Sequence, residues 1–463
     1  MRRIYIIGAT LIVAGLLLSA CVPLTYSPPT EIYLNPGDQV KQAVIAVDNE
    51  GRSHIAGVAN DRIIYYRTRF GEKLTAFEMT MTGSGANWKQ YNPDIAVLDS
   101  GRAIVTWVEQ RGGTDKYACQ QQIPILVPIG GFDKDCDPLD GNEKTVGNVW
   151  VTARGETAYA VYDRPAGNGR TADLWYQQLA GGAAIGRVDW FFGELKTAEL
   201  YSLDLGIDDG GFLHVGYHYN WTINGTPPFA ERMELRSNRT TQPDGKMSQI
   251  WLIFEGFFIE YTPLSLSFYQ DGATQRVALA FGSYYQVFVQ SCSVIGCASQ
   301  AYDEVAWPVS WWTNSMVSEV EILGIDNNLH VGFIGNSNST PISTDQVYRK
   351  VNAFDASNAE QVSSGSAMSK YSLELTRVNA RPNAAAAYFA VIAWGETDQS
   401  VNEFFVYDGI LNRIKVYSTD CAVNLPKGVI GSNGFYVSGV WDDCSNTIFT
   451  TQAWNTQLPL ITK

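Results

Sequence analysis

Charge is scarce in this sequence, and segments typical of helices are missing. Charged residues make up 17% of the chain, and no long segment is rich in Glu, Lys and Ala, so a helical architecture is disfavoured. Basic residues are also outnumbered: 33 Lys and Arg face 47 Asp and Glu, which leaves a formal net charge of −14. Such a surface repels phosphate backbones, and without a basic stripe we expect no nucleic-acid partner.

The common catalytic motifs are missing as well. The sequence has no Gly-x-Ser-x-Gly elbow, no His-Glu-x-x-His pair, no P-loop and no dinucleotide fingerprint in a suitable context. The spacing of its cysteines and histidines fits neither common zinc pattern. These absences exclude the best-marked enzyme classes and leave architecture as the main information in the sequence.

What the sequence does contain is a repeat. An apolar run, a tight polar turn and an alternating strand that ends near an aromatic recur. The clearest copies are VIAVDNEGRSHIAGV (44–58), IAVLDSGRAIVTW (95–107), LGIDDGGFLHVGY (205–217) and LGIDNNLHVGF (323–333). A unit of about 50 residues made of short strands cannot bury its apolar faces alone, but copies stacked around an axis can. The repeat therefore predicts an all-β fold, a β-propeller.

Eight copies can be aligned on the strand that follows the turn. They are His54–Val58, Ala103–Trp107, Thr157–Tyr162, Leu213–Tyr217, Arg276–Phe281, Leu329–Phe333, Tyr388–Trp394 and Phe435–Trp441. We expect eight blades over residues 31–463, and seven as the alternative, because three copies lack an Asp in the turn. The last copy runs out of chain before its outer strand, and we expect Glu31–Leu34 to supply that strand and close the ring.

The N-terminus reads as a targeting segment. Arg2 and Arg3 precede an apolar stretch that is too short for an ordinary membrane span. Leu18-Ser19-Ala20-Cys21 follows and resembles the bacterial lipobox. The resemblance implies a signal peptide over 1–20, a lipid such as palmitate on Cys21, a Pro-rich tether over 21–30, and a location outside the cytoplasm, anchored to the envelope membrane. The alternative is an ordinary secretory signal with an incidental cysteine.

The remaining six cysteines fall into three close pairs, which are Cys119 with Cys136, Cys292 with Cys297, and Cys421 with Cys444. An exported chain favours disulfides, and each pair lies within one repeat. Six cysteines allow fifteen pairings, so the local pairing is a hypothesis.

As a pattern of blades, the chain resembles the sialidase-like and BNR-like propellers of exported bacterial proteins. The resemblance implies the fold and raises the possibility of sialidase chemistry. The sequence departs from that family in two ways. Its Asp-containing turn lies between the first and second strands of each repeat, and the family's Arg-Ile-Pro signature is absent.

Three of the four histidines, His54, His214 and His330, occupy one repeat position. Repeat symmetry places them in different blades, so we expect a local role in each turn rather than a shared metal site. His218 lies further along its strand and is the one histidine that we consider for function.

Polar and aromatic residues recur where the second strands end, on the face where propeller ligands usually bind. The expected ligand-binding residues are Glu109, Arg111, Asp163, Arg164, Tyr219, Trp221, Trp311, Trp312, Glu396 and Asp442. Such a ring could bind sugar hydroxyls, and the four carboxylates Glu109, Asp163, Glu396 and Asp442 are weak catalytic candidates. The alternative is that they are solvated or turn-capping groups at the start of loops.

An acidic loop at 133–143 suggests calcium, with Asp133, Asp135 and Asp137 as candidate ligands. Pro138 stands where an EF-hand needs glycine, so this is not an EF-hand, and a solvated acidic loop is the alternative. No other cofactor is expected.

Three functions remain open. The first is an anchored binding or scaffold propeller for a glycan or protein ligand. The second is a sialidase-like or other glycoside-active enzyme that uses carboxylates at the propeller mouth. The third is an assembly subunit of an envelope complex.

Overall fold

The structure is a computed structural model of the chain. It describes residues 24–26, 30–32, 40–69, 72–81, 87–126, 134–139, 146–165, 171–190, 196–223, 226–243, 245–256, 264–283, 286–296, 303–304, 316–336, 345–355, 359–363, 369–379, 388–397, 402–407, 414–419, 428–432, 436–442 and 448–455. Within these ranges the regular elements are β-strands, and no helix there is long and apolar enough to cross a membrane.

Five of the seven sheets have four strands each, joined antiparallel in chain order. Their strands are β3 (Val40–Val47), β4 (Ser53–Ala59), β5 (Arg62–Arg69) and β6 (Glu72–Glu78); β7 (Lys89–Val97), β8 (Ala103–Arg111), β9 (Asp115–Ile123) and β10 (Asp137–Pro138); β19 (Leu264–Asp271), β20 (Thr274–Ser283), β21 (Gln286–Ser293) and β22 (Asp303–Glu304); β23 (Met316–Ile325), β24 (Asn328–Asn336), β25 (Asp345–Lys350) and β26 (Glu360–Gln361); and β27 (Ser369–Asn379), β28 (Tyr388–Thr397), β29 (Asn402–Tyr407) and β30 (Ile414–Thr419).

The other two sheets are larger. One holds eight strands, β11 (Val149–Arg154), β12 (Thr157–Pro165), β13 (Thr171–Ala180), β14 (Ile185–Trp190), β15 (Lys196–Ile207), β16 (Leu213–Ile223), β17 (Thr226–Thr241) and β18 (Met247–Gly256). It is two groups of four, linked where Thr171 of β13 pairs with Ala198 of β15. The last sheet joins β31 (Gly428–Ser432), β32 (Tyr436–Asp442) and β33 (Ile448–Asn455) to β1 (Leu24–Tyr26) and β2 (Thr30–Ile32).

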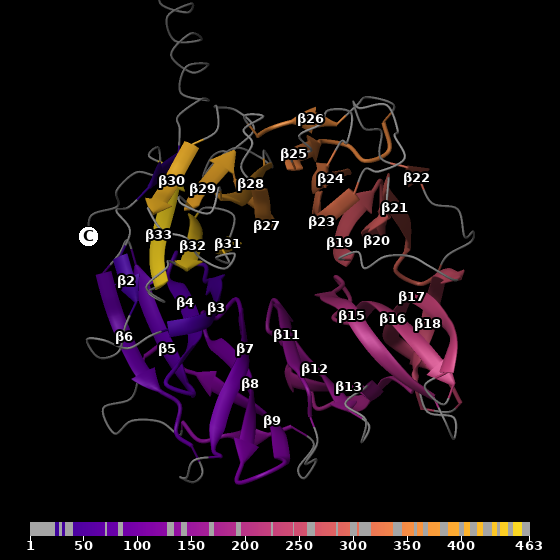
Figure 1. The fold of residues 1–463 in the computed structure, drawn as a ribbon, viewed down its shortest axis with the longest axis horizontal. Coiled ribbons are helices and arrows are strands. Elements are labelled where there is room, and N and C mark those ends of the chain that lie inside the picture. The colour runs from indigo at the N-terminus through magenta and orange to yellow at the C-terminus, as the bar shows by residue number, and fades with distance from the viewer. Residues whose placement is uncertain are drawn as a thin grey trace, which may run out of the picture.

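The sheets are arranged radially around one axis (Figure 1). The first strand of each group lies nearest the centre, and these inner strands are β3, β7, β11, β15, β19, β23, β27 and β31. We call each group of strands a blade, and the strand after the inner one the second strand. This radial arrangement agrees with the predicted all-β propeller class.

The apolar core lies between neighbouring blades. Tyr65 of β5 packs with Trp107 and Val105 of β8, and all three side chains are fully buried. Val289 of β21 packs in the same way with Phe333 of β24. Alternate residues of a strand face opposite sides of its sheet, so each blade buries one face against each neighbour.

Strands from the two ends of the chain meet in the last sheet. Both β1 and β2 pair antiparallel with β33, as Leu24 pairs with Asn455 and Thr30 with Thr450. The predicted outer strand Glu31–Leu34 overlaps β2, although the strand begins one residue earlier. An N-terminal segment therefore covers the edge of the C-terminal strand, which an exposed ladder would otherwise leave open to aggregation.

The turns between inner and second strands explain two of the histidines. Asp48 accepts the backbone N–H groups of Glu50 and Arg52, and its other oxygen lies 3.0 Å from Nε2 of His54. Burial opposes ionisation, but the bonds from His54 and Arg52 lower the pKa of Asp48 to about 2. The histidine therefore serves its own turn, as predicted, although it bonds the aspartate side chain rather than the backbone.

The same turn recurs around Asp208, whose carboxylate lies 2.8 Å from Nε2 of His214. Gly211 adopts a left-handed φ of 80° there, which favours glycine. His330 has the same repeat position, but burial and the nearby Arg349 lower its pKa to about 4.

Candidate functional site

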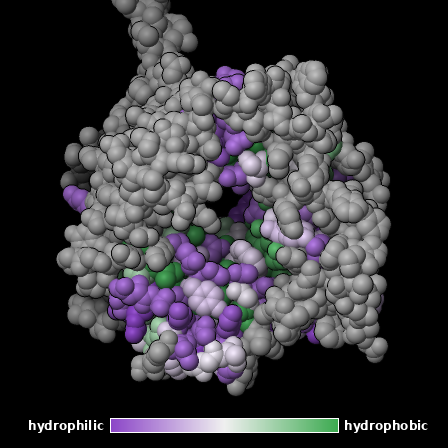
Figure 2. All heavy atoms as spheres, in the orientation of Figure 1, coloured by the Kyte–Doolittle hydropathy of each residue, from purple (hydrophilic) through white to green (hydrophobic). Residues whose placement is uncertain are grey.

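The ring has two distinct faces. Inner strands begin and second strands end on one of them, which we call the mouth face. The opposite one carries the Asp-containing turns and is called the turn face. Figure 2 looks along the ring axis and shows a hollow at the centre, with both hydrophilic and hydrophobic side chains around it where the atoms are coloured. The candidate site is the mouth-face end of this channel.

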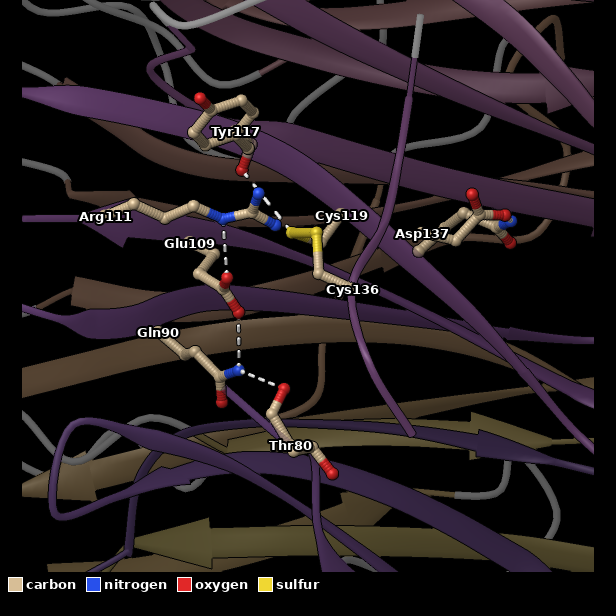
Figure 3. Close-up of a disulfide and its surroundings, with 9 residues drawn as sticks. Thr80, Gln90, Glu109, Arg111, Tyr117, Cys119, Cys136 and Asp137 are labelled. Atoms are coloured by element: carbon tan, nitrogen blue, oxygen red, sulfur yellow. Dashed lines mark hydrogen bonds and ion pairs between the residues drawn. A yellow bond between two sulfur atoms is a disulfide. The ribbon is translucent and has the colours of Figure 1, made fainter. Parts of the chain in front are cut away.

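Glu109 lies near the mouth-face end of β8, but it is fully buried. Its carboxylate accepts a hydrogen bond from Nε2 of Gln90 at 2.9 Å and another from Nε of Arg111 at 2.8 Å (Figure 3). The amide oxygen of Gln90 in turn accepts the N–H of Ile63 in the preceding blade at 2.8 Å. Glu109 therefore takes part in a link between two blades.

Two other predicted carboxylates have similar surroundings. Asp163 is 5% exposed and accepts the backbone N–H of Asn148, just before the inner strand of its blade. Glu396 is fully buried, accepts the indole N–H of Trp394 at 2.9 Å and lies 3.7 Å from the ammonium of Lys370. These carboxylates bond groups of their own blades.

The strands continue to these residues or past them, so the alternative that loops begin before them does not hold. Strand β8 continues to Arg111, β12 to Pro165, β28 to Thr397 and β32 to Asp442. The aromatic residue that precedes each carboxylate therefore lies inside its strand. Pairing with the third strand continues past it, as when Arg111 of β8 pairs with Asp115 of β9.

The remaining predicted ligand residues are dispersed. The Arg111 guanidinium lies 4.2 Å from the ring centroid of Tyr117, and Arg164 lies 4.1 Å from that of Trp175. Tyr219 is buried and donates to Glu234 at 3.0 Å. The side chains of Trp221 and Asp442, and residues Trp311 and Trp312, lie outside the described part of the structure.

A buried polar network joins the third and fourth blades, and sequence reasoning missed it. The Tyr217 hydroxyl donates to Asp189 of β14 at 2.7 Å and accepts from Nε of Arg236 at 2.7 Å. Arg236 also pairs with Glu234 at 2.8 Å. Burial and the two carboxylates raise the pKa of Tyr217 well above its ordinary value. His218, the histidine considered for function, follows Tyr217 in β16 and is buried. Its ring centroid lies 5.2 Å from that of Tyr201.

The mouth end of the first inner strands carries a ladder of amide side chains, which we call the amide ladder: Gln42, Asn92 and Asn148. The backbone N–H of Asn92 donates to the Gln42 amide oxygen at 3.2 Å, and Nδ2 of Asn92 donates to Oδ1 of Asn148 at 2.8 Å. Each step crosses from one blade to the next. Gln42 is exposed, and the other two are partly exposed.

The same strained backbone conformation occurs at two residues of the amide ladder, in neighbouring blades. Gln42 and Asn92 have left-handed φ values of 51° and 50°, and each sits in a bulge where the inner strand slips against the second strand. A non-glycine residue in this region costs about 1–2 kcal/mol. Such strain persists where the surroundings hold it, and it concentrates at ligand sites.

Two aspartates lie just deeper in the channel wall. Asp94 accepts the N–H of Val151 in the next blade and that of Ile95, each at 2.8 Å. Asp204 accepts the N–H of Leu266 in the next blade at 2.6 Å. Burial raises the pKa of each carboxyl to about 6, and the charge of Asp204 adds to the rise at Asp94.

Metal ligands are not gathered in the part of the acidic loop that is described. Asp137 accepts a hydrogen bond from Gln120, and Asp135 is exposed, while Asp133 lies outside the described residues. The acidic and sulfur groups that do converge among the described residues are Glu109, Cys119 and Cys136, and the two sulfurs form a disulfide.

The predicted pairing of Cys119 with Cys136 is confirmed, and the bond ties β9 to the segment before β10 (Figure 3). Cys292 is also disulfide-bonded. Its predicted partner Cys297 lies outside the described residues, as do Cys421, Cys444 and the lipobox residue Cys21.

Comparisons with known proteins give weak likenesses. No protein-family model and no curated protein matches the sequence. Among solved structures, the Dos1 propeller is 9% identical, with 92% of this chain and 94% of that chain covered and a TM-score of 0.46. An α-L-arabinanase of Penicillium chrysogenum complexed with arabinobiose is 11% identical, with 86% and 98% covered and a TM-score of 0.35.

A GH93 α-L-arabinofuranosidase of Fusarium graminearum, also with arabinobiose, is 12% identical, with 67% and 92% covered and a TM-score of 0.37. By their names, two of these three neighbours are an arabinanase and an arabinofuranosidase. With TM-scores below 0.5, however, the likeness carries no argument about function.

Proposed function

We propose that this protein is an exported, lipid-anchored β-propeller that binds a glycan at its channel mouth. The finer architecture belongs to the same proposal: eight blades, with β2 as the outer strand of the last blade and closing the ring. The amide ladder is the observation that carries the proposal. Amide groups both donate and accept hydrogen bonds, as sugar hydroxyls do, and the most exposed of them, Gln42, lies near the mouth-face end of the inner strand β3.

The charge of the channel favours a neutral glycan over a sialylated one. Asp94 and Asp204 have pKa values raised to about 6 by burial, so both are largely ionised at pH 7.5. A sugar carboxylate placed above them meets like charge, which disfavours binding. The sialidase-like resemblance is therefore proposed for the fold and not for the ligand.

A thermal-shift and glycan-array screen of the mature chain tests this proposal, with neutral oligosaccharides, sialosides and calcium as probes. Asn92→Gly removes the amide and keeps a residue that tolerates left-handed φ. Gln110→Ala, at a half-buried mouth-face position outside the ladder, is the matched control. We expect a rise in Tm with a neutral glycan that Asn92→Gly loses and Gln110→Ala keeps. Retention of the signal by both variants would refute this placement.

Glycoside hydrolysis is the second candidate, and the two channel aspartates favour it. A carboxyl with a pKa near 6 is suited to act as a general acid near neutral pH, and Asp94 and Asp204 both have this property. Neutral 4-methylumbelliferyl glycosides are the probes. Hydrolysis that Asp204→Asn abolishes, with glycan binding retained, would establish it; binding without turnover would favour the lectin-like function.

The proposal also includes the lipid anchor and the two remaining disulfides. A signal peptide over 1–20, a lipidated Cys21 and the disulfides Cys292–Cys297 and Cys421–Cys444 follow from the sequence. Metabolic palmitate labelling and non-reduced peptide mapping test them. A calcium site at Asp133, Asp135 and Asp137 is proposed only in the form of a loose loop site, and a calcium-specific rise in Tm tests it.

A further inference from the structure

We propose that the turn face rests on the membrane surface, with a rim of exposed apolar side chains in contact with lipid and the mouth directed away from it. This inference rests on the proposed lipid anchor at Cys21 and adds an orientation and a second contact. The rim is defined by the large apolar side chains that are exposed among the described residues. They are Leu74 (47% exposed), Leu126 (81%), Ile185 (47%), Ile295 (79%), Val351 (48%) and Phe354 (40%).

These six side chains share one place in the blade. Each follows the third strand, in the turn to the outer strand or at the beginning of the outer strand. Leu126 comes three residues after β9, whose last residue, Ile123, pairs with Ala103 at the start of β8. Second strands begin on the turn face, so Leu126 lies there as well.

The other members follow the same geometry. Ile295 stands in the turn after β21, whose last residue, Ser293, pairs with Arg276 near the start of β20. Leu74 follows Lys73, which pairs with Thr68 opposite Ser53 at the start of β4. The rim members belong to five different blades, so the apolar side chains are spread around the perimeter of one face.

The N-terminal chain enters on this same face. Leu24 of β1 pairs with Asn455, the last residue of β33. The neighbouring residue Trp454 pairs with Tyr436, at the start of the second strand β32. Second strands start on the turn face, so Leu24 lies there as well. Cys21 is three residues before Leu24, which brings a lipid on Cys21 to the face that carries the rim.

A flat lipid surface fits this arrangement better than a protein partner does. A stable protein interface needs one continuous buried patch, whereas the rim is a ring of separate side chains. A bilayer held against the face by a tether meets all of them at once, and the tether makes each added contact intramolecular.

Electrostatics are not expected to drive the contact. Several charged groups on the turn face are paired, as in Arg52 with Glu50 at 3.1 Å and Arg276 with Asp271 at 3.4 Å. The contact should therefore form on zwitterionic lipid and be insensitive to salt, unlike that of a polybasic surface.

Depth-dependent quenching on the full, lipidated chain tests the proposal. Leu126→Cys and Ile295→Cys place a bimane probe on the rim, and Asn87→Cys places one at an exposed mouth-face position. The protein is reconstituted in phosphatidylcholine vesicles with either a doxyl-lipid quencher or aqueous iodide. We expect doxyl lipid to quench the two rim probes at least about threefold more than the Asn87 probe, and iodide to show the opposite order.

Palmitate labelling of Cys21 in the same samples tests the lipid anchor separately from the contact of the turn face with the membrane. Labelled protein whose three probes quench equally, or whose Asn87 probe quenches most, would overturn the orientation. Rim probes shielded from both quenchers would overturn it too, because a protein partner would then cover the rim. Unlabelled protein with quenched rim probes would refute the anchor and keep the contact, and unlabelled protein without quenching would refute both.

Discussion

The channel aspartates make a prediction about stability that can be worked from the structure. Burial raises the pKa of Asp94 and Asp204 from an ordinary 3.8 to about 6. The folded state therefore binds these protons more tightly than the unfolded state does. The free energy of unfolding should fall as the pH rises from about 4 to about 6, because ionisation costs more in the fold than in the unfolded chain.

The magnitude follows from the size of the rise in pKa. A rise of about 2 corresponds to at most about 3 kcal/mol for each carboxyl. The value is an upper limit because Asp94 and Asp204 are partly exposed as residues. Asp94 also senses the charge of Asp204, so the two effects should not add, and a double-mutant cycle should show coupling.

The perturbation is Asp94→Asn, which imitates the neutral carboxyl at all pH values. We expect the substitution to change Tm little at pH 4 and to raise it progressively as the pH increases to 7.5, with Asp204→Asn behaving alike. Thermal or urea unfolding measured from pH 4 to 8 provides the assay, and Asp326→Asn on an exposed turn is the control. An equal loss of stability at both pH values would show that these groups act as ionised acceptors and would refute the reasoning.

Three further changes probe the contacts between and within blades. Tyr217→Phe leaves Asp189 and Arg236 without their shared hydroxyl, so it should cost about 1–3 kcal/mol in urea unfolding, and an unchanged midpoint would argue against the network. Cys119→Ser opens a disulfide that spans 17 residues and should lower stability by about 3 kcal/mol; reductant should lower the stability of the wild type at least as much, because it also opens the disulfide of Cys292. Asp208→Asn should lower Tm at pH 7 and have less effect as the pH approaches 2, because hydrogen bonds hold the pKa of that carboxyl at about 2 despite burial; a loss of Tm that does not depend on pH would contradict this.

The sequence was most informative where the signal is periodic. The apolar run, turn and alternating strand predicted the second strands, and each predicted one overlaps a strand from β4 to β32. The turn chemistry of Asp48 and His54 could also be read, because all its groups lie within seven residues. Local patterns of this kind depend on backbone geometry that a short segment determines by itself.

The contacts of side chains on the mouth face could not be predicted from the sequence in the same way. Glu109 and Asp163 follow an aromatic, which indicates a loop, but the hairpin ladder continues and buries them. The amide ladder joins residues 50 and 56 positions apart, and its contacts depend on bulges that shift the register of each inner strand. The exposed rim has no periodicity at all, because it arises where turns are placed in space. These features follow from tertiary register, which the residues of one segment do not specify.

The most direct test of glycan binding at the mouth is a binding titration of the best array ligand against the wild type, Asn92→Gly and Gln110→Ala. Loss of one or two ligand hydrogen bonds costs about 1.4 kcal/mol or more. The account predicts a Kd at least about tenfold weaker for Asn92→Gly and an unchanged Kd for Gln110→Ala. Equal affinity of Asn92→Gly and the wild type would contradict it.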